Sequence, residues 1–171
     1  EVFKEEILDK EDFVSECTID TDFPILIPDT YVENVPERLS LYTQLDNCEN
    51  EEQLQLFIAS LQDRFGALPT PVQHLIDALR VRWIAQDLGF EKLILKNKQM
   101  KLHFLSNPSS PYFESDVFKK ILDAIQYQIK NARLKHIGTN AFLIIDHVND
   151  ILTVKNILTL MKGKNQNTVT Q

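Results

Sequence analysis

The sequence is poor in glycine, and this shortage excludes one large class of sites. Only four glycines occur among the 171 residues, and they stand singly at Gly66, Gly89, Gly138 and Gly163, each at a predicted helix end or turn. Loops that cradle phosphates in nucleotide hydrolases and dinucleotide enzymes need clustered glycines just before a helix. We therefore expect no nucleotide site in the chain.

Cysteine and histidine are also scarce and poorly placed for chemistry. Neither Cys17 nor Cys48 has metal-ligand spacing, and the four histidines form no i, i+4 pair. Serines follow His103, but no G-x-S-x-G elbow surrounds them. We expect no catalytic residue, no metal and no cofactor. Two isolated cysteines favour free thiols in a reducing cytoplasm, with a single disulfide as the alternative.

Long apolar runs and a basic-then-apolar leader are absent from the sequence. We therefore expect no transmembrane helix and no signal peptide. Hydrophobic residues make up 43% and charged residues 25%, which are ordinary values for a globular chain. Because the first residue is Glu1 and not methionine, we expect a piece of a longer protein.

Charge is distributed unevenly along the chain. Residues 1–63 carry 17 acidic and 3 basic side chains, whereas residues 64–171 carry 8 acidic and 15 basic ones. An acidic first third repels a phosphate backbone and suits a basic protein partner better. A solvated acidic face explains the same residues equally well. The basic remainder lacks the interleaved aromatics of a groove for single-stranded nucleic acid.

Three helices are predicted in the first half. The first follows Pro36. The second opens at Asn50 with capping-box spacing and carries an apolar stripe that ends at Phe65, after which Gly66 suits a left-handed cap. The third begins with Thr70 and a first-turn proline.

The remainder predicts strands and two more helices. Residues 91–96 and 100–105 are predicted to form a hairpin, a helix follows Ser115, strands at 133–137 and 141–146 pair next, and a last helix ends before Gly163. Upstream, residues 18–31 are predicted to be extended, with Ile25–Ile27 as an edge strand between two prolines. Hairpins with segregated helices predict a single α+β domain. We expect a linker over residues 1–17, the domain over 18–163 and a disordered tail over 164–171.

Five short segments stand out by their order and spacing: Ile27–Tyr31, Arg38–Tyr42, Asp63–Pro69, Leu75–Arg80 and Leu88–Leu93. Together they resemble the C-terminal domain of the bacterial transcription-repair coupling factors, the Mfd family. Any one of them is weak, but their order and spacing are specific, and the convincing similarity runs from about Ile19 to Leu95.

The resemblance implies a regulatory module without a motor of its own. In this family the parent is an ATP-dependent DNA translocase that displaces stalled RNA polymerase and recruits excision repair through UvrA. The C-terminal domain packs on the UvrB-like N-terminal module and hides its UvrA-binding surface. The implied partners are therefore that module and, through the parent, RNA polymerase, UvrA and double-stranded DNA.

The same resemblance implies an interdomain contact at Asp63 and Arg64, where the second helix of the family faces the N-terminal module. The sequence departs from the family pattern one turn earlier, because Ser60 stands where a glutamate is expected. Purely structural roles remain open, since Phe65 ends an apolar stripe, Arg64 favours the helix dipole, and Asp63 could pair with Arg38 or Arg80.

Two other functions are weighed against this one. A nucleic-acid-binding accessory domain would use the basic region after Arg64 and would need one contiguous lysine and arginine face. A small hydrolase would need acids such as Asp20, Asp22 and Asp29 to converge in a pocket. Only the number of acids favours the hydrolase.

Overall fold

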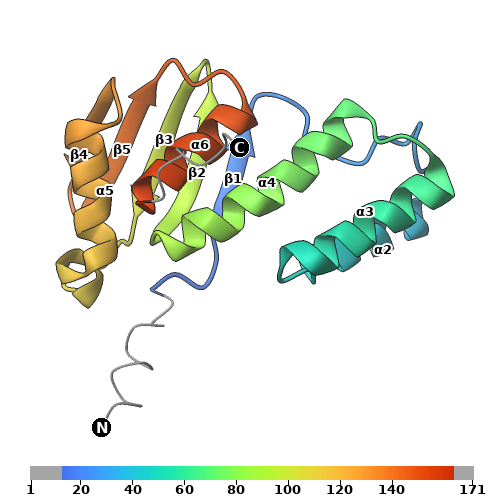
Figure 1. The fold of residues 1–171 in the computed structure, drawn as a ribbon, viewed down its shortest axis with the longest axis horizontal. Coiled ribbons are helices and arrows are strands. Elements are labelled where there is room, and N and C mark those ends of the chain that lie inside the picture. The colour runs from blue at the N-terminus through green and yellow to red at the C-terminus, as the bar shows by residue number, and fades with distance from the viewer. Residues whose placement is uncertain (1–12, 164–171) are drawn as a thin grey trace, which may run out of the picture. The chain divides into compact units, whose positions relative to one another are not determined.

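The computed structural model describes residues 13–163, which form helices and a mixed sheet (Figure 1). The elements in chain order are β1 (Thr18–Thr21), α2 (Val35–Asp46), α3 (Glu51–Phe65), α4 (Thr70–Asp87), β2 (Phe90–Lys96), β3 (Gln99–Phe104), the 3-10 helix η1 (Pro111–Glu114), α5 (Asp116–Tyr127), β4 (Ala132–Ile137), β5 (Asn140–Asp146) and α6 (Ile151–Met161).

These elements divide into two compact units. Phe23–Leu79 form one, which we call the helical unit, and the described residues on either side of it form the other, the sheet unit. Helix α4 contributes to both, because the boundary falls between Leu79 and Arg80. This division was not among the expectations from the sequence. Each unit is described separately below.

The sheet unit is built on five strands in the order β1-β2-β3-β5-β4. Strand β1 pairs parallel to β2, and all other neighbours are antiparallel. Helices α5 and α6, with the last part of α4, lie on one face of this sheet (Figure 1). Among the described residues of this unit, no helix covers the opposite face.

Side chains alternate between the two faces of the sheet along each strand, and most of the apolar ones point to the face that α5 and α6 cover. Leu93, Leu102 and Leu143 are partners in one register row and are each 0% exposed. Burial of three such side chains contributes about 1.5–3 kcal/mol each. The core of this unit is therefore a continuous leucine and isoleucine layer between the sheet and the helices.

Tyr112, in η1, is the largest fully buried side chain of the sheet unit. Its hydroxyl donates a 2.5 Å hydrogen bond to the Leu88 carbonyl, and burial raises its pKa. Gly89 follows with a φ of +87°, and a Cβ there would lie 2.2 Å from the Tyr112 ring. Glycine is therefore required at this position for two reasons, the positive φ and the lack of room for a Cβ.

The helical unit is held together by side chains that bond to the backbone. The Asn34 and Asn50 side chains accept from the N–H groups of Glu37 and Gln53, which caps α2 and α3. The Gln53 side chain in turn accepts from the N–H of Glu49, close to the expected capping box. Sequence-local signals thus explain where both helices begin.

The prediction of an α+β fold is confirmed, but the first strand was misplaced. Residues Ile25–Ile27 form no strand, and β1 lies earlier, at Thr18–Thr21. Ile27 is nevertheless buried at 3% exposure, because its N–H donates to the Tyr42 hydroxyl instead of to a strand neighbour. The strand at this edge of the sheet is therefore β1 and not Ile25–Ile27.

The remaining elements agree with the sequence within a residue or two. The β2–β3 turn is closed by Asn97 and Lys98, both with positive φ, as two-residue hairpin turns require. Ser115 caps α5 as predicted. No helix in the described part of the chain is both long and apolar enough to cross a membrane.

The predicted tail at 164–171 and residues 1–12 of the predicted linker lie outside the described residues. Residues 13–17 belong to the sheet unit, since Val14 and Cys17 are buried and the Phe13 ring lies 5.3 Å from that of Tyr112. The Gln86 side chain donates to the Ser15 carbonyl. The last part of the predicted linker is therefore packed on the sheet unit.

Candidate functional site

Helix α3 positions the two predicted interface residues in its last turn. Leu54, Phe57 and Leu61 form its buried stripe. Asp63 lies on the opposite, solvent-facing side, whereas Arg64, three residues after Leu61, lies beside the stripe, and both are exposed. Gly66, with φ +89°, ends the helix and donates its N–H to the Gln62 carbonyl. The helix end is therefore well defined, and its polar side chains point outward.

Arg64 is held by neighbours within the helical unit. Its guanidinium forms an ion pair with Glu37 of α2 and lies 4.8 Å from the centroid of the Phe65 ring. Both partners of the ion pair are partly exposed, so it adds little stability but limits the rotamers of Arg64. Contacts within the helical unit therefore orient the Arg64 side chain in the absence of a partner.

Asp63 differs from Arg64 in having no such neighbour. Among residues 13–163 its carboxylate makes no ion pair and no hydrogen bond, and the pairing considered with Arg38 is absent. Arg38 instead donates a 2.8 Å hydrogen bond to the Val32 carbonyl. The outward carboxylate of Asp63 is therefore available to a partner.

Apolar side chains accompany this charged end of α3. Leu56, Ser60 and Asp63 are spaced i, i+4, i+7 and share one face of the helix. Leu56 is 70% exposed, and on α2 Leu39 is 60% exposed. An exposed leucine on the same helical face as a free carboxylate is typical of a protein interface. The sequence analysis did not single out Leu56 or Leu39.

Three other residues of the matching segments make internal contacts. The Tyr31 hydroxyl donates to the Gly66 carbonyl at 2.8 Å and lies 3.3 Å from the Leu61 carbonyl, which ties the extended segment to the end of α3. The Tyr42 hydroxyl accepts from the N–H of Ile27 at 2.7 Å. With the hydrogen bond of Arg38 described above, these contacts give the three side chains a structural role.

Two of the three acids considered for a hydrolase, Asp20 and Asp22, have structural partners. Asp20 pairs with Lys96 at 2.9 Å, and a hydrogen bond from that lysine lowers the pKa of Asp20. Asp22 accepts from the N–H of Asn97 at 2.8 Å. A general acid needs a raised pKa, so the lowered pKa of Asp20 argues against that role. No group of three potential ligands among the described residues could hold a metal ion.

Both thiols are buried in residues 13–163 and neither is in a disulfide, as predicted. Burial raises the pKa of Cys17 to about 11 and also raises the pKa of Cys48. A reactive cysteine requires the opposite shift. The geometry therefore leaves the exposed end of α3 as the candidate site of the helical unit.

Comparison with solved structures places the fold in a known class. The chain superimposes on the C-terminal domain of a transcription-repair coupling factor with a TM-score of 0.67 and 16% identity, covering 88% of this chain and 96% of that one. At that identity the likeness establishes the fold, an α+β domain of this class.

Sequence comparison then identifies the family. The TRCF domain family matches residues 21–115, more than half of the chain. The chain belongs to the TRCF domain family. It is 39% identical over 84 residues to the transcription-repair-coupling factor of Escherichia coli K12, covering 48% of this chain and 7% of the relative. It is 28% identical over 135 residues to that of Rickettsia bellii, covering 78% of this chain and 11% of the relative.

The chain thus spans about a tenth of the length of these curated relatives. The match at 21–115 covers the whole helical unit. The similarity noted in the sequence, from about Ile19 to Leu95, falls mostly inside the matched range.

Proposed function

We propose that this chain is the autoinhibitory C-terminal domain of a transcription-repair coupling factor. In this role it packs on the UvrB-like N-terminal module of the same parent protein. The contact masks the UvrA-binding surface of that module until RNA polymerase is engaged. The parent is a cytoplasmic, ATP-dependent translocase on double-stranded DNA, and the domain itself carries out no reaction.

The observation that supports this proposal most is the state of Asp63 and Arg64. Arg64 is preoriented by Glu37 and Phe65, whereas Asp63 has no partner within the described residues. An outward pair of opposite charges fixes the register and identity of a partner more than it adds affinity. This is the behaviour that a releasable contact needs.

Exposed leucines of the helical unit supply the affinity that charges alone do not. Leu56 on α3 and Leu39 on α2 are 70% and 60% exposed, and covering such side chains removes apolar area from water. The acidic balance of residues 1–63 further favours a basic partner surface over nucleic acid. Together these features fit a protein partner for the helical unit.

The energetics of such a contact must be modest. A closed state favoured by about 3 kcal/mol is occupied more than about 99% of the time, yet it opens when polymerase contacts favour the open state by a similar amount. Ser60 is consistent with a moderate contact, because a serine there cannot make the ion pair that a glutamate would make.

A titration of this chain against the UvrB-like module of its parent tests the proposal. We expect saturable binding that the Asp63→Ala, Arg64→Ala double variant weakens about tenfold or more, the range found for truncated interface charges. Ser60→Glu should tighten binding severalfold by restoring an acid on the same helical face. Isothermal titration calorimetry gives the dissociation constants directly.

The matched control is Lys119→Ala, Asp123→Ala on α5, which also removes one base and one acid from an exposed helical face, but in the sheet unit. This control should bind as the wild type does. Equal binding by wild type and the Asp63, Arg64 variant would move the interface elsewhere. Absence of binding, both between the separate parts and when a flexible linker joins them in one chain, would reject the proposed masking.

A further inference from the structure

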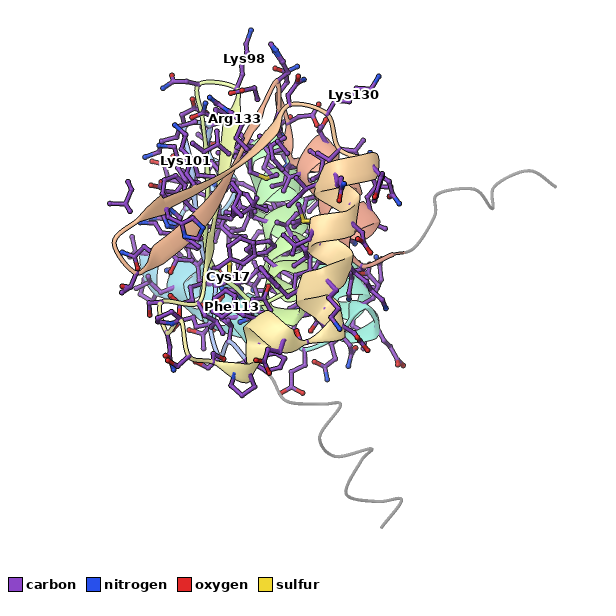
Figure 2. All side chains as sticks on the ribbon, turned by 90° about the vertical axis from the view of Figure 1, so that its left-hand side faces the viewer. Cys17, Lys98, Lys101, Phe113, Lys130 and Arg133 are labelled. Atoms are coloured by element: carbon purple, nitrogen blue, oxygen red, sulfur yellow. The ribbon has the colours of Figure 1, made fainter. Side chains whose placement is uncertain are left out.

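The face of the sheet opposite α5 and α6 is rich in cations. Residues paired in register point to the same side of a sheet, so the partners of each row can be placed together. One row joins Lys92, His103, Phe142 and Lys135, and the next joins Asp20, Ile94, Lys101, Ile144 and Arg133. Figure 2 shows Lys101 and Arg133 on the side of the sheet away from α5.

Two carboxylates on this face are already paired, which leaves a surplus of positive charge. Asp20 pairs with Lys96 at 2.9 Å and Asp146 with Arg133 at 3.0 Å. Lys92, Lys101 and Lys135 form no ion pair with any residue of 13–163, and their partners in neighbouring strands are uncharged. We call these three side chains the lysine triad.

An aromatic pair lies inside the lysine triad. The His103 and Phe142 rings stack with centroids 5.3 Å apart and an angle of 24° between their planes. Lys92 follows His103 on one side of the row, and Lys135 follows Phe142 on the other. Phe142 is buried, whereas His103 is partly exposed. Burial, together with Lys92 and Lys101, lowers the pKa of His103 against the opposing effect of the nearby Glu91 carboxylate, and the lower pKa favours the neutral ring.

A shallow hollow of about 320 Å³ adjoins the triad. Ile94 forms part of its lining, and amide and ammonium groups surround it at Lys96, Asn97, Gln99 and Lys101. An apolar patch edged by donors accommodates a planar base while cations hold the adjoining phosphates. Sequence reasoning overlooked this arrangement because the aromatic residues come from strands far apart in the chain.

We propose that this open sheet face binds single-stranded nucleic acid. The lysine triad contacts successive phosphates, His103 stacks on one base, and the hollow beside Lys101 receives a neighbouring base. The shared chemistry is a flexible polyphosphate with exposed bases, supplied either by a DNA strand or by RNA.

Single strands fit the face better than a duplex or an acidic protein. The face belongs to a sheet and presents no projecting helix or ribbon for a major groove among the described residues. An acidic peptide would use the lysines but would have no planar group for His103 and the hollow. This inference goes beyond the proposed masking, which concerns the helical unit.

Fluorescence anisotropy of labelled oligonucleotides tests the proposal on the 171-residue chain. Oligo(dT) and oligo(U) of about 12 nucleotides, a duplex of equal length and an oligoglutamate peptide are compared. With three phosphate contacts, affinity for a single strand should fall roughly 20-fold between about 50 and 200 mM salt. Comparing oligo(dT) with oligo(U) distinguishes the two sources.

The variant Lys92→Gln, Lys101→Gln should lose more than about tenfold in affinity and show a shallower salt dependence. Lys119→Gln, Lys120→Gln on α5 makes the same change of net charge on the helical side and should bind as the wild type does. His103→Ala should lose about fivefold in affinity without changing the salt dependence.

Other outcomes would overturn the proposal. Equal loss in the two lysine variants would show a response to net charge alone. A duplex or oligoglutamate bound as tightly as the single strands would assign the face to a different partner. Absence of binding at about 50 mM salt would remove nucleic acid altogether.

Discussion

The helical unit and the sheet unit expose different kinds of side chain. In the helical unit, Tyr31, Arg38 and Tyr42 bond to the backbone, and Leu39 and Leu56 are exposed although most of its other leucines are buried. In the sheet unit, leucines fill the interior and lysines cover the open face. This difference underlies the two proposals made above, a protein partner for the helical unit and a phosphate-bearing ligand for the sheet face.

Two glycines with nearly the same φ give the largest expected contrast between the units. Gly66 has φ +89° and open space around its Cβ position, whereas Gly89 has φ +87° and the Tyr112 ring at 2.2 Å. Alanine at position 89 therefore adds a buried clash to backbone strain and should cost more than about 3 kcal/mol. Alanine at position 66 adds strain alone and should cost about 1–2 kcal/mol.

Urea unfolding measures both costs. Trp83 is the only tryptophan and lies in the sheet unit, so its fluorescence follows that unit, while far-UV circular dichroism follows all helices. Similar losses in the two alanine variants would show that the contact with Tyr112 relaxes freely.

Removing one tyrosine hydroxyl from each unit gives a smaller expected difference in the free energy of unfolding. Removal of the Tyr112 hydroxyl leaves the buried Leu88 carbonyl without its 2.5 Å donor, so Tyr112→Phe should cost about 1–2 kcal/mol. Tyr42 is only partly buried, and water can replace its hydroxyl at the Ile27 N–H. Tyr42→Phe should therefore cost about 0.5–1 kcal/mol in the same unfolding experiment. A reversed order would contradict this account of the two units.

The smallest expected difference concerns thiol reactivity. A pKa of about 11 leaves roughly one thiolate per thousand Cys17 side chains at pH 8, so alkylation should be about 100-fold slower than in urea. The rate should rise about tenfold per pH unit up to that pKa, because only the thiolate reacts. Cys48, which is 8% exposed against 2% for Cys17, should react faster.

Timed iodoacetamide labelling with mass spectrometry gives both rates. A faster reaction at Cys17 than at Cys48 would show that the sheet unit opens more readily than the helical unit.

The features that could be predicted from the sequence depend on interactions between residues that are close in the chain. Asn50, Ser115 and Gly66 act within a few residues of themselves, so helices α3 and α5 were located from capping signals and apolar stripes. These features depend on periodicity and on backbone groups close in the chain. Asp63 and Arg64 were singled out by the family resemblance.

The features that could not be predicted from the sequence depend on pairing between strands that are far apart in the chain. Ile25–Ile27 has the composition of a strand, yet Thr18–Thr21 pairs with β2. Which segment becomes a strand was decided by a partner about 70 residues away, a separation that local propensity does not report. The contact between the His103 and Phe142 rings could not be predicted for the same reason, since β3 and β5 become neighbours only when the sheet forms.

The parallel pairing of β1 with β2 also has a consequence for biosynthesis. Because residues 23–79 lie between these strands, the helical unit is an insertion within the sheet unit. A ribosome adding about 5–20 residues per second leaves β1 waiting on the order of 4–15 s for its partner strand. The inserted helices, whose contacts are local, can fold during that interval. The unit that is encoded in the middle of the chain therefore completes its fold before the unit that surrounds it.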